Sequence, residues 1–82
     1  MKKFKKFELV KILEYYFPEF NLTVKAKIEK HEEEFVYEWS HFHSSYHPSQ
    51  NSAPTLADAE YRIDEYMYAF TGGYKINKGW KN

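Results

Sequence analysis

The segment from Leu22 to Glu29 reads LTVKAKIE and alternates strictly between apolar and polar side chains. Successive side chains of a β-strand point to opposite faces, so this pattern predicts a half-buried strand whose inward side chains are Leu22, Val24, Ala26 and Ile28. An antiparallel sheet with one covered face must therefore be part of the fold, and other segments must supply the cover.

The chain has 82 residues, which is enough for one domain, so we predict a single domain over residues 1–82. It contains no cysteine, which excludes disulfides, thiolate nucleophiles and cysteine-ligated metal sites. Aromatic residues make up 21% of the sequence, and their large buried areas compensate for the missing cross-links.

Residues 4–17 show apolar side chains at helical spacing, and Pro18 disfavours helical geometry at the residue before it. We therefore expect a first helix from about Phe4 to Phe17, although no good N-cap precedes it. Its apolar stripe would consist of Leu9, Ile12, Leu13, Tyr16 and, from the turn beyond, Phe20.

A second helix is expected to begin after Thr55, which has the hydroxyl of a good N-cap. Thr71-Gly72-Gly73 would end it, because glycine accepts the left-handed conformation that follows many helices. Its inward residues recur at helical spacing: Leu56, Ala59, Ile63, Tyr66, Met67 and Phe70.

Between the helices, residues 31–34 read as a loose hairpin tip and Phe35 to His43 as a second strand with a bulge near Ser40. Ser44–Pro54 is expected to be a loop, with a third strand near residues 45–47 as the alternative. Residues 74–76 are expected as a short additional strand. The predicted fold class is α+β, in the order α-β-β-(β)-α, with two helices packed on one face of a short antiparallel sheet.

The net charge is zero but unevenly placed: residues 7–73 hold all 12 acids against five bases. The two ends are rich in lysine and carry no acid: Lys2, Lys3, Lys5 and Lys6 at one end, Lys75, Lys78 and Lys81 at the other. No run approaches the roughly 18 apolar residues that span a bilayer, and charged residues interrupt the N-terminal segment, so we expect a cytoplasmic protein without a membrane partner.

Three histidines lie close together in sequence, and His41 and His43 would share one face of a strand. With His47 they are candidate metal ligands, but H-x-H supplies no defined third ligand, so we interpret them as polar surface and predict no cofactor. Neither a nucleophile motif nor a glycine-rich phosphate loop is present, so we predict that the chain is not an enzyme.

Several aromatic and acidic side chains have no clear place in the expected core. Tyr37, Trp39, Phe42 and Tyr46 could stack bases of a single strand, but glutamates surround them where a positive groove is needed. Acids and tyrosines share the outer face of the second helix, which favours a basic protein partner. The candidate partner-binding residues are Trp39, Tyr46, Asp58, Tyr61, Asp64, Glu65 and Tyr68.

No family motif is present, yet the chain is similar in style to phage or mobile-element accessory proteins, including anti-CRISPR inhibitors. The likeness consists of small size, a single domain, the lack of a catalytic motif and a Lys/Asn/Tyr/Phe/Ile-rich composition. It implies a non-enzymatic inhibitor that occludes a basic surface of a host nucleic-acid-handling machine. The alternatives are a single-stranded nucleic-acid-binding protein, using the lysine-rich ends and strand aromatics, and a His-ligated metal protein.

Overall fold

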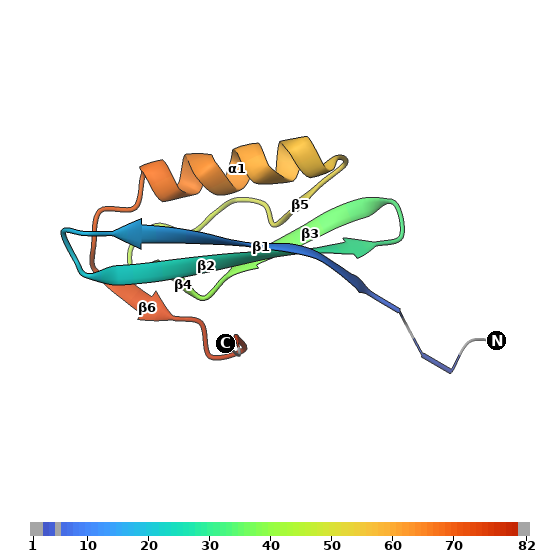
Figure 1. The fold of residues 1–82 in the computed structure, drawn as a ribbon, viewed down its shortest axis with the longest axis horizontal. Coiled ribbons are helices and arrows are strands. Elements are labelled where there is room, and N and C mark those ends of the chain that lie inside the picture. Colours follow the sequence, from blue (N-terminus) through green and yellow to red (C-terminus); the bar gives the residue numbers. More distant parts are fainter. Residues whose placement is uncertain (1–2, 5, 81–82) are drawn as a thin grey trace.

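A four-stranded antiparallel sheet with a single helix lying across one face forms the body of the protein (Figure 1). The computed structural model describes residues 3–4 and 6–80. The sheet has the strand order β1-β2-β3-β5, with the bounds β1 Glu8–Phe17, β2 Leu22–His31, β3 Glu34–Trp39 and β5 Ser52–Ala53.

The helix, α1, spans Leu56–Tyr68, and two short strands, β4 (His41–His43) and β6 (Tyr74–Ile76), pair as a small second sheet. The predicted class of two helices on a sheet is therefore wrong. Over the described residues the chain forms one helix and six strands, and is mostly sheet.

The expected helix over residues 4–17 is instead the strand β1, which pairs with β2 from Glu8↔Lys30 to Phe17↔Leu22. Leu13, Tyr15 and Phe17 turn toward α1, and the residues between them are exposed. The segment is rich in residues that fit a pleated, half-buried surface, and pairing with β2 satisfies one row of its backbone hydrogen-bonding groups. Tertiary pairing thus overrides the helical spacing of its leucines.

The predicted strand at residues 22–29 is confirmed as the centre of the molecule. Val24, Ala26 and Ile28 of β2 are fully buried, and they belong to the same core cluster as Ile63 of α1. Fully burying one such aliphatic side chain stabilises the fold by roughly 1.5–3 kcal/mol.

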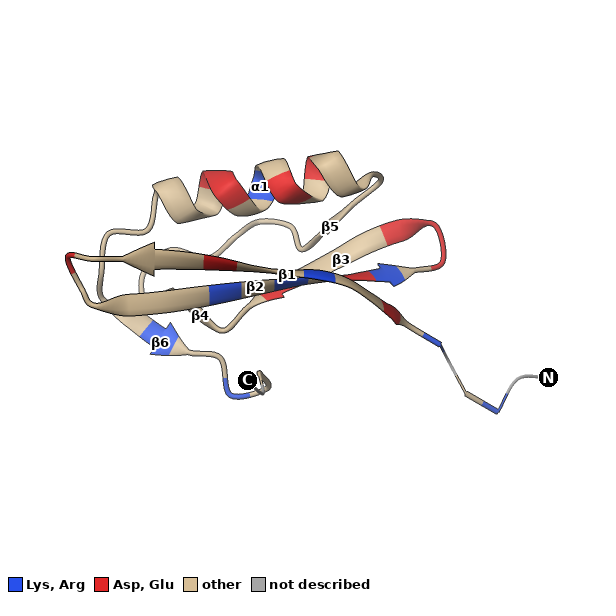
Figure 2. Ribbon diagram, viewed as in Figure 1, with Lys and Arg blue, Asp and Glu red and all other residues tan. Residues whose placement is uncertain are grey.

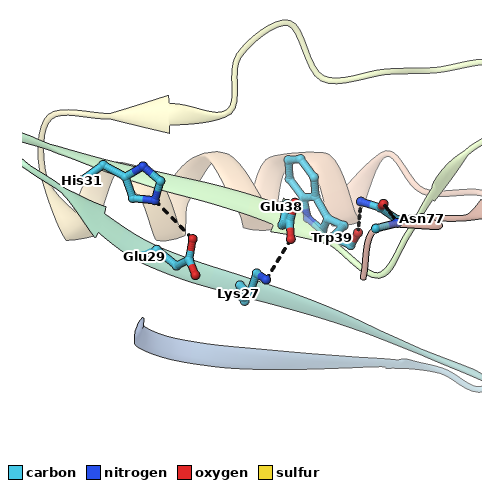
Figure 3. Close-up of polar contacts among 7 residues, drawn as sticks. Lys27, Glu29, His31, Glu38, Trp39 and Asn77 are labelled. Carbon is cyan, nitrogen blue, oxygen red and sulfur yellow. Dashed lines mark hydrogen bonds and ion pairs between the residues drawn. The ribbon is translucent and has the colours of Figure 1, made fainter. Parts of the chain in front are cut away.

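On β2 and β3, Lys27 and Glu38 form a cross-strand ion pair, and His31 and Glu29 contact each other within β2 (Figure 3). Lys27 Nζ lies 3.0 Å from Glu38 Oε1, and the Lys27 ammonium is 5.1 Å from the ring centroid of Trp80. Asn77 Nδ2 donates to the Trp39 carbonyl at 3.0 Å, which fixes the segment after β6 against the end of β3.

Ser40 is the point at which the chain leaves the main sheet. Its amide donates to the Lys25 carbonyl at 2.8 Å, and its hydroxyl accepts the Lys25 amide at 2.9 Å. The bulge expected near this residue is a complete break: β3 ends at Trp39, and β4 pairs with β6 from residue 41. The additional strand in the loop lies at β5, not at residues 45–47.

The second predicted helix is confirmed, with Thr55 Oγ1 accepting the amide of Asp58 at 3.1 Å as the N-cap. The helix ends at the C-cap Ala69. Gly72 and Gly73 lie beyond it, both with positive φ, in the turn that leads to β6. The predicted short strand at residues 74–76 is present as β6.

Candidate functional site

The outward face of α1 carries acids and two exposed tyrosines. Figure 2 shows acidic positions along the helix, and the sequence of α1 contains one base, Arg62. Asp58, Tyr61, Glu65 and Tyr68 recur at i, i+3, i+7 and i+10, so they form one stripe, which we call the α1 stripe. Tyr61 is 64% exposed and Tyr68 is 88% exposed.

Glu65 restrains one of these tyrosines. A hydrogen bond from the Tyr61 phenol to the Glu65 carboxylate, together with the charge of that carboxylate, raises the pKa of Tyr61 above its ordinary value. The phenol of Tyr61 thus lies beside a carboxylate on the surface of the helix. The stripe combines apolar contact area with negative charge, which suits a basic partner surface.

Asp64 lies on the side of α1 that faces β1. It accepts a hydrogen bond from the Tyr15 hydroxyl, and one turn earlier Lys11 Nζ lies 3.3 Å from Glu60 Oε2. Partial burial, followed by the hydrogen bond and charge of Asp64, raises the pKa of Tyr15 well above its ordinary value. These two contacts fasten the helix to the edge strand.

A groove of about 400 Å³ opens between the second half of β1 and the second half of α1, and we call it the α1–β1 groove. Two of the predicted site residues, Asp64 and Tyr68, line it. Its other lining residues come from β1 and from the buried side of the helix: Glu14, Tyr15, Tyr16, Phe17 and Met67. The β1 residues were not predicted as site residues, because that segment was interpreted as a helix.

Trp39 does not belong to a contact surface. It is only 5% exposed, and its ring lies 4.6 Å from Tyr66 and 5.4 Å from Tyr37 in the core. Its indole Nε1 is buried without a hydrogen-bond partner among the described residues. Trp39 is therefore a core residue and not part of the candidate surface. Tyr37 is buried beside it, so these two aromatics cannot stack bases either.

Tyr46 is 45% exposed and lies on the opposite side of the helix from the α1–β1 groove. Its ring stacks on Tyr66 with centroids 5.0 Å apart, and together with Glu65 it lines a second cavity of about 290 Å³. The predicted site residues are thus spread around three sides of α1. Of these residues, only Asp64 and the members of the α1 stripe lie close to one another.

A wider hollow, about 950 Å³, lies between the hairpin tip and the loop before the helix. Glu32, Glu33 and Glu34 line it on one side. Arg62, on the other side, is engaged by the loop through Gln50 Oε1 at 2.6 Å and the Ser52 carbonyl at 2.8 Å. The only arginine of the chain therefore has a structural role in holding this loop.

The histidines of β4 make separate contacts. His41 Nδ1 lies 2.9 Å from Ser40 Oγ, and partial burial lowers the pKa of His41 below its ordinary value. His43 Nδ1 accepts the Ser45 amide at 3.1 Å, and the His47 ring lies 5.2 Å from Phe42. In the described part of the chain, no group of three or more His, Asp or Glu side chains is placed to hold a metal ion.

The lysine-rich ends are only partly described, because Lys2, Lys5 and Lys81 lie outside the described residues. Lys3, Lys6, Lys75 and Lys78 are exposed, at the two ends of the described chain. Among the described residues, no helix is long and apolar enough to cross a membrane.

Comparison of the chain with models of known protein families, with curated protein sequences and with solved structures found no match. The function is therefore inferred from the geometry of the α1 stripe and the α1–β1 groove.

Proposed function

We propose that this chain is a small non-enzymatic protein-binding module whose α1 stripe docks on a basic surface of a protein partner. The observation that carries the proposal is the exposure of Tyr61 and Tyr68 on a helix that also bears Asp58 and Glu65. Tyrosine is enriched at protein interfaces, where its ring provides contact area with little loss of conformational entropy.

Electrostatics support the same surface. Four acids and one base lie within α1, and the one base, Arg62, is engaged by the preceding loop. Complementary charge speeds association and discriminates against acidic partners. We extend the proposal to an inhibitor, of the kind found in phage or mobile elements, that acts in the cytoplasm and occludes the nucleic-acid-binding surface of a host protein, as anti-CRISPR proteins do.

The test is affinity capture from host lysate followed by reconstitution with the purified captured protein. We expect the wild type to capture a basic protein and to displace nucleic acid from it, and Tyr61→Ala/Glu65→Lys to lose both activities. Glu33→Lys, at the exposed hairpin tip, is the control for the change of charge and should behave as the wild type. Wild-type capture by Tyr61→Ala/Glu65→Lys would contradict the assignment of this surface.

The two alternatives predict different results with the purified chain alone. Single-stranded nucleic-acid binding would appear as retardation that weakens steeply with salt and with neutralisation of Lys3 and Lys6. A metal protein would retain stoichiometric metal that is lost in His41→Ala/His43→Ala. Either result would replace the protein-binding proposal.

A further inference from the structure

The α1–β1 groove combines an apolar floor with aromatic and acidic walls. Phe17 and Met67 form its inner side, and both pack into or against the core. Three tyrosines surround this floor, of which Tyr16 is 60% exposed and Tyr68 almost fully exposed. The groove therefore offers both a surface for methylene groups and the faces or edges of aromatic rings.

Two carboxylates complete the lining, and no lysine, arginine or histidine is among the described residues that line it. One oxygen of Asp64 accepts the hydroxyl of Tyr15. Glu14 has only a loose ion pair, with its Oε1 3.9 Å from Lys25 Nζ, and its side chain is 63% exposed. The groove thus has negative charge that its own residues do not neutralise.

The groove also lies along an unpaired sheet edge. β1 is the first strand in the order β1-β2-β3-β5 and pairs on one side only, with β2, within the described part of the chain. Residues from both faces of β1 line the groove, because Glu14 and Tyr16 alternate with Tyr15 and Phe17. An open strand edge presents unpaired backbone groups to which an extended segment can add as a further strand.

We infer that the α1–β1 groove binds an arginine or lysine side chain of an extended protein segment that pairs with the free edge of β1. The aliphatic part of that side chain packs on Phe17 and Met67, and its cation meets the ring of Tyr68 and the carboxylates of Asp64 and Glu14. Cations within about 6 Å of a tyrosine ring are attracted to its face. Arginine fits better than lysine, because its planar guanidinium stacks on the ring and also binds carboxylates in a bidentate manner.

The inference rests on the proposed function, since it specifies what the basic partner presents, but it uses different residues from the α1 stripe except for Tyr68. A second copy of this chain is a poorer occupant. Its own edge strand would bring one base, Lys11, which already pairs with Glu60, and would bring Glu8 and Glu14 to an acidic groove.

The direct test is a titration of the full isotope-labelled chain with short peptides of alternating threonine and valine around a central arginine, followed by amide chemical shifts. We expect the largest shifts at residues 13–17 and 64–68. Replacing the central arginine by the uncharged isostere citrulline should weaken binding about 5- to 30-fold, from the loss of one cation–π contact and two exposed ion pairs. Methylation of alternate peptide amides should abolish strand addition.

Glu14→Gln/Asp64→Asn is the matched variant of the protein. Asparagine at position 64 still accepts the Tyr15 hydroxyl, so the fold is retained. The cation–π contact with Tyr68 remains in this variant, so we expect a smaller loss for the arginine peptide, about 2- to 10-fold from two exposed ion pairs, and none for the citrulline peptide. Equal binding of both peptides to the wild type, or unchanged binding to this variant, would overturn the inference. So would a dimer in sedimentation equilibrium whose interface shields the amides of β1.

The two proposals fail separately. If Tyr61→Ala/Glu65→Lys loses partner capture while the wild type ignores the arginine peptide, the function stands and the groove assignment is wrong. If the arginine peptide binds as described but Tyr61→Ala/Glu65→Lys and Glu14→Gln/Asp64→Asn both still capture the partner, the groove is a peptide site and the assignment of the α1 stripe as the docking surface is wrong.

Discussion

The hydroxyl of Tyr66 joins three segments of the chain, and Tyr66→Phe removes that single oxygen. The residue is 3% exposed, and its ring lies between Trp39 and Tyr46. The hydroxyl accepts the backbone amide of His43 at 2.9 Å and donates to the carbonyl of Tyr46 at 2.7 Å. It therefore attaches β4 and the loop after it to α1.

The expected loss follows from these two bonds. A typical hydrogen bond contributes a net 0.5–1.5 kcal/mol, and a buried group left without a partner costs about 1–3 kcal/mol. Phenylalanine keeps the ring and its stacking, so no large cavity forms. We expect the free energy of unfolding to fall by about 2 kcal/mol, and the midpoint of thermal unfolding by about 10 °C for a domain of this size.

Urea unfolding and thermal melts measure the loss, and hydrogen exchange at the His43 amide locates it. Tyr68→Phe is the matched control: it is the same substitution two residues further along the helix, at a side chain that is 88% exposed, and it should change stability by less than about 0.5 kcal/mol. If Tyr66→Phe is as stable as this control and the His43 amide exchanges at the wild-type rate, the role assigned to the hydroxyl is wrong.

Three further perturbations test other parts of the structure. Thr55→Ala removes the N-cap hydroxyl of α1 and should cost about 1 kcal/mol in urea unfolding, without a shift in the oligomeric state. Gly72→Ala should cost about 1–3 kcal/mol, since φ is +95° and the added Cβ would lie 3.0 Å from a ring carbon of Phe20; a neutral effect would contradict this conformation. The free energy of unfolding should fall as the pH rises above about 10. The folded state raises the pKa of Tyr15 and Tyr66, so the two phenols lose their protons in the unfolded chain first. Tyr15→Phe should flatten this pH dependence.

The features that local chemistry dictates were predicted from the sequence. The alternation at residues 22–29 requires a half-buried strand whatever surrounds it, and the structure has Val24, Ala26 and Ile28 at 0% exposure. The N-cap at Thr55 and the inward stripe of α1 are equally local, because capping and helical periodicity depend on residues within a few positions. Both were confirmed.

The strand β1 could not be predicted from local sequence patterns. Leu9, Ile12, Leu13 and Tyr16 have helical spacing, yet Leu13, Tyr15 and Phe17 also have strand spacing, and periodicity alone does not separate the two. The long-range partner decides: β2 pairs with β1 from Leu22 to Lys30, and this pairing satisfies one row of the backbone hydrogen-bonding groups of β1. The absence of an N-cap and the run of β-favouring residues at 15–17 were the signs available in the sequence.

Because residues 4–17 were expected to form a helix, the half of the candidate site that lies on β1 was not predicted. A helix at residues 4–17 would have satisfied its own backbone and left no edge for an added strand. As a strand, the segment places Glu14 and Tyr16 next to Asp64 and Tyr68, about fifty positions away in sequence, and leaves one row of backbone groups open beside them. The contribution of α1, Asp64 and Tyr68, could be predicted because helical periodicity is local. The contribution of β1 could not, because it depends on which strand β1 pairs with. The acidic character of the surface therefore follows from the sequence. The proposed binding of an extended basic segment depends on the open edge of β1 beside the groove, which only the fold provides.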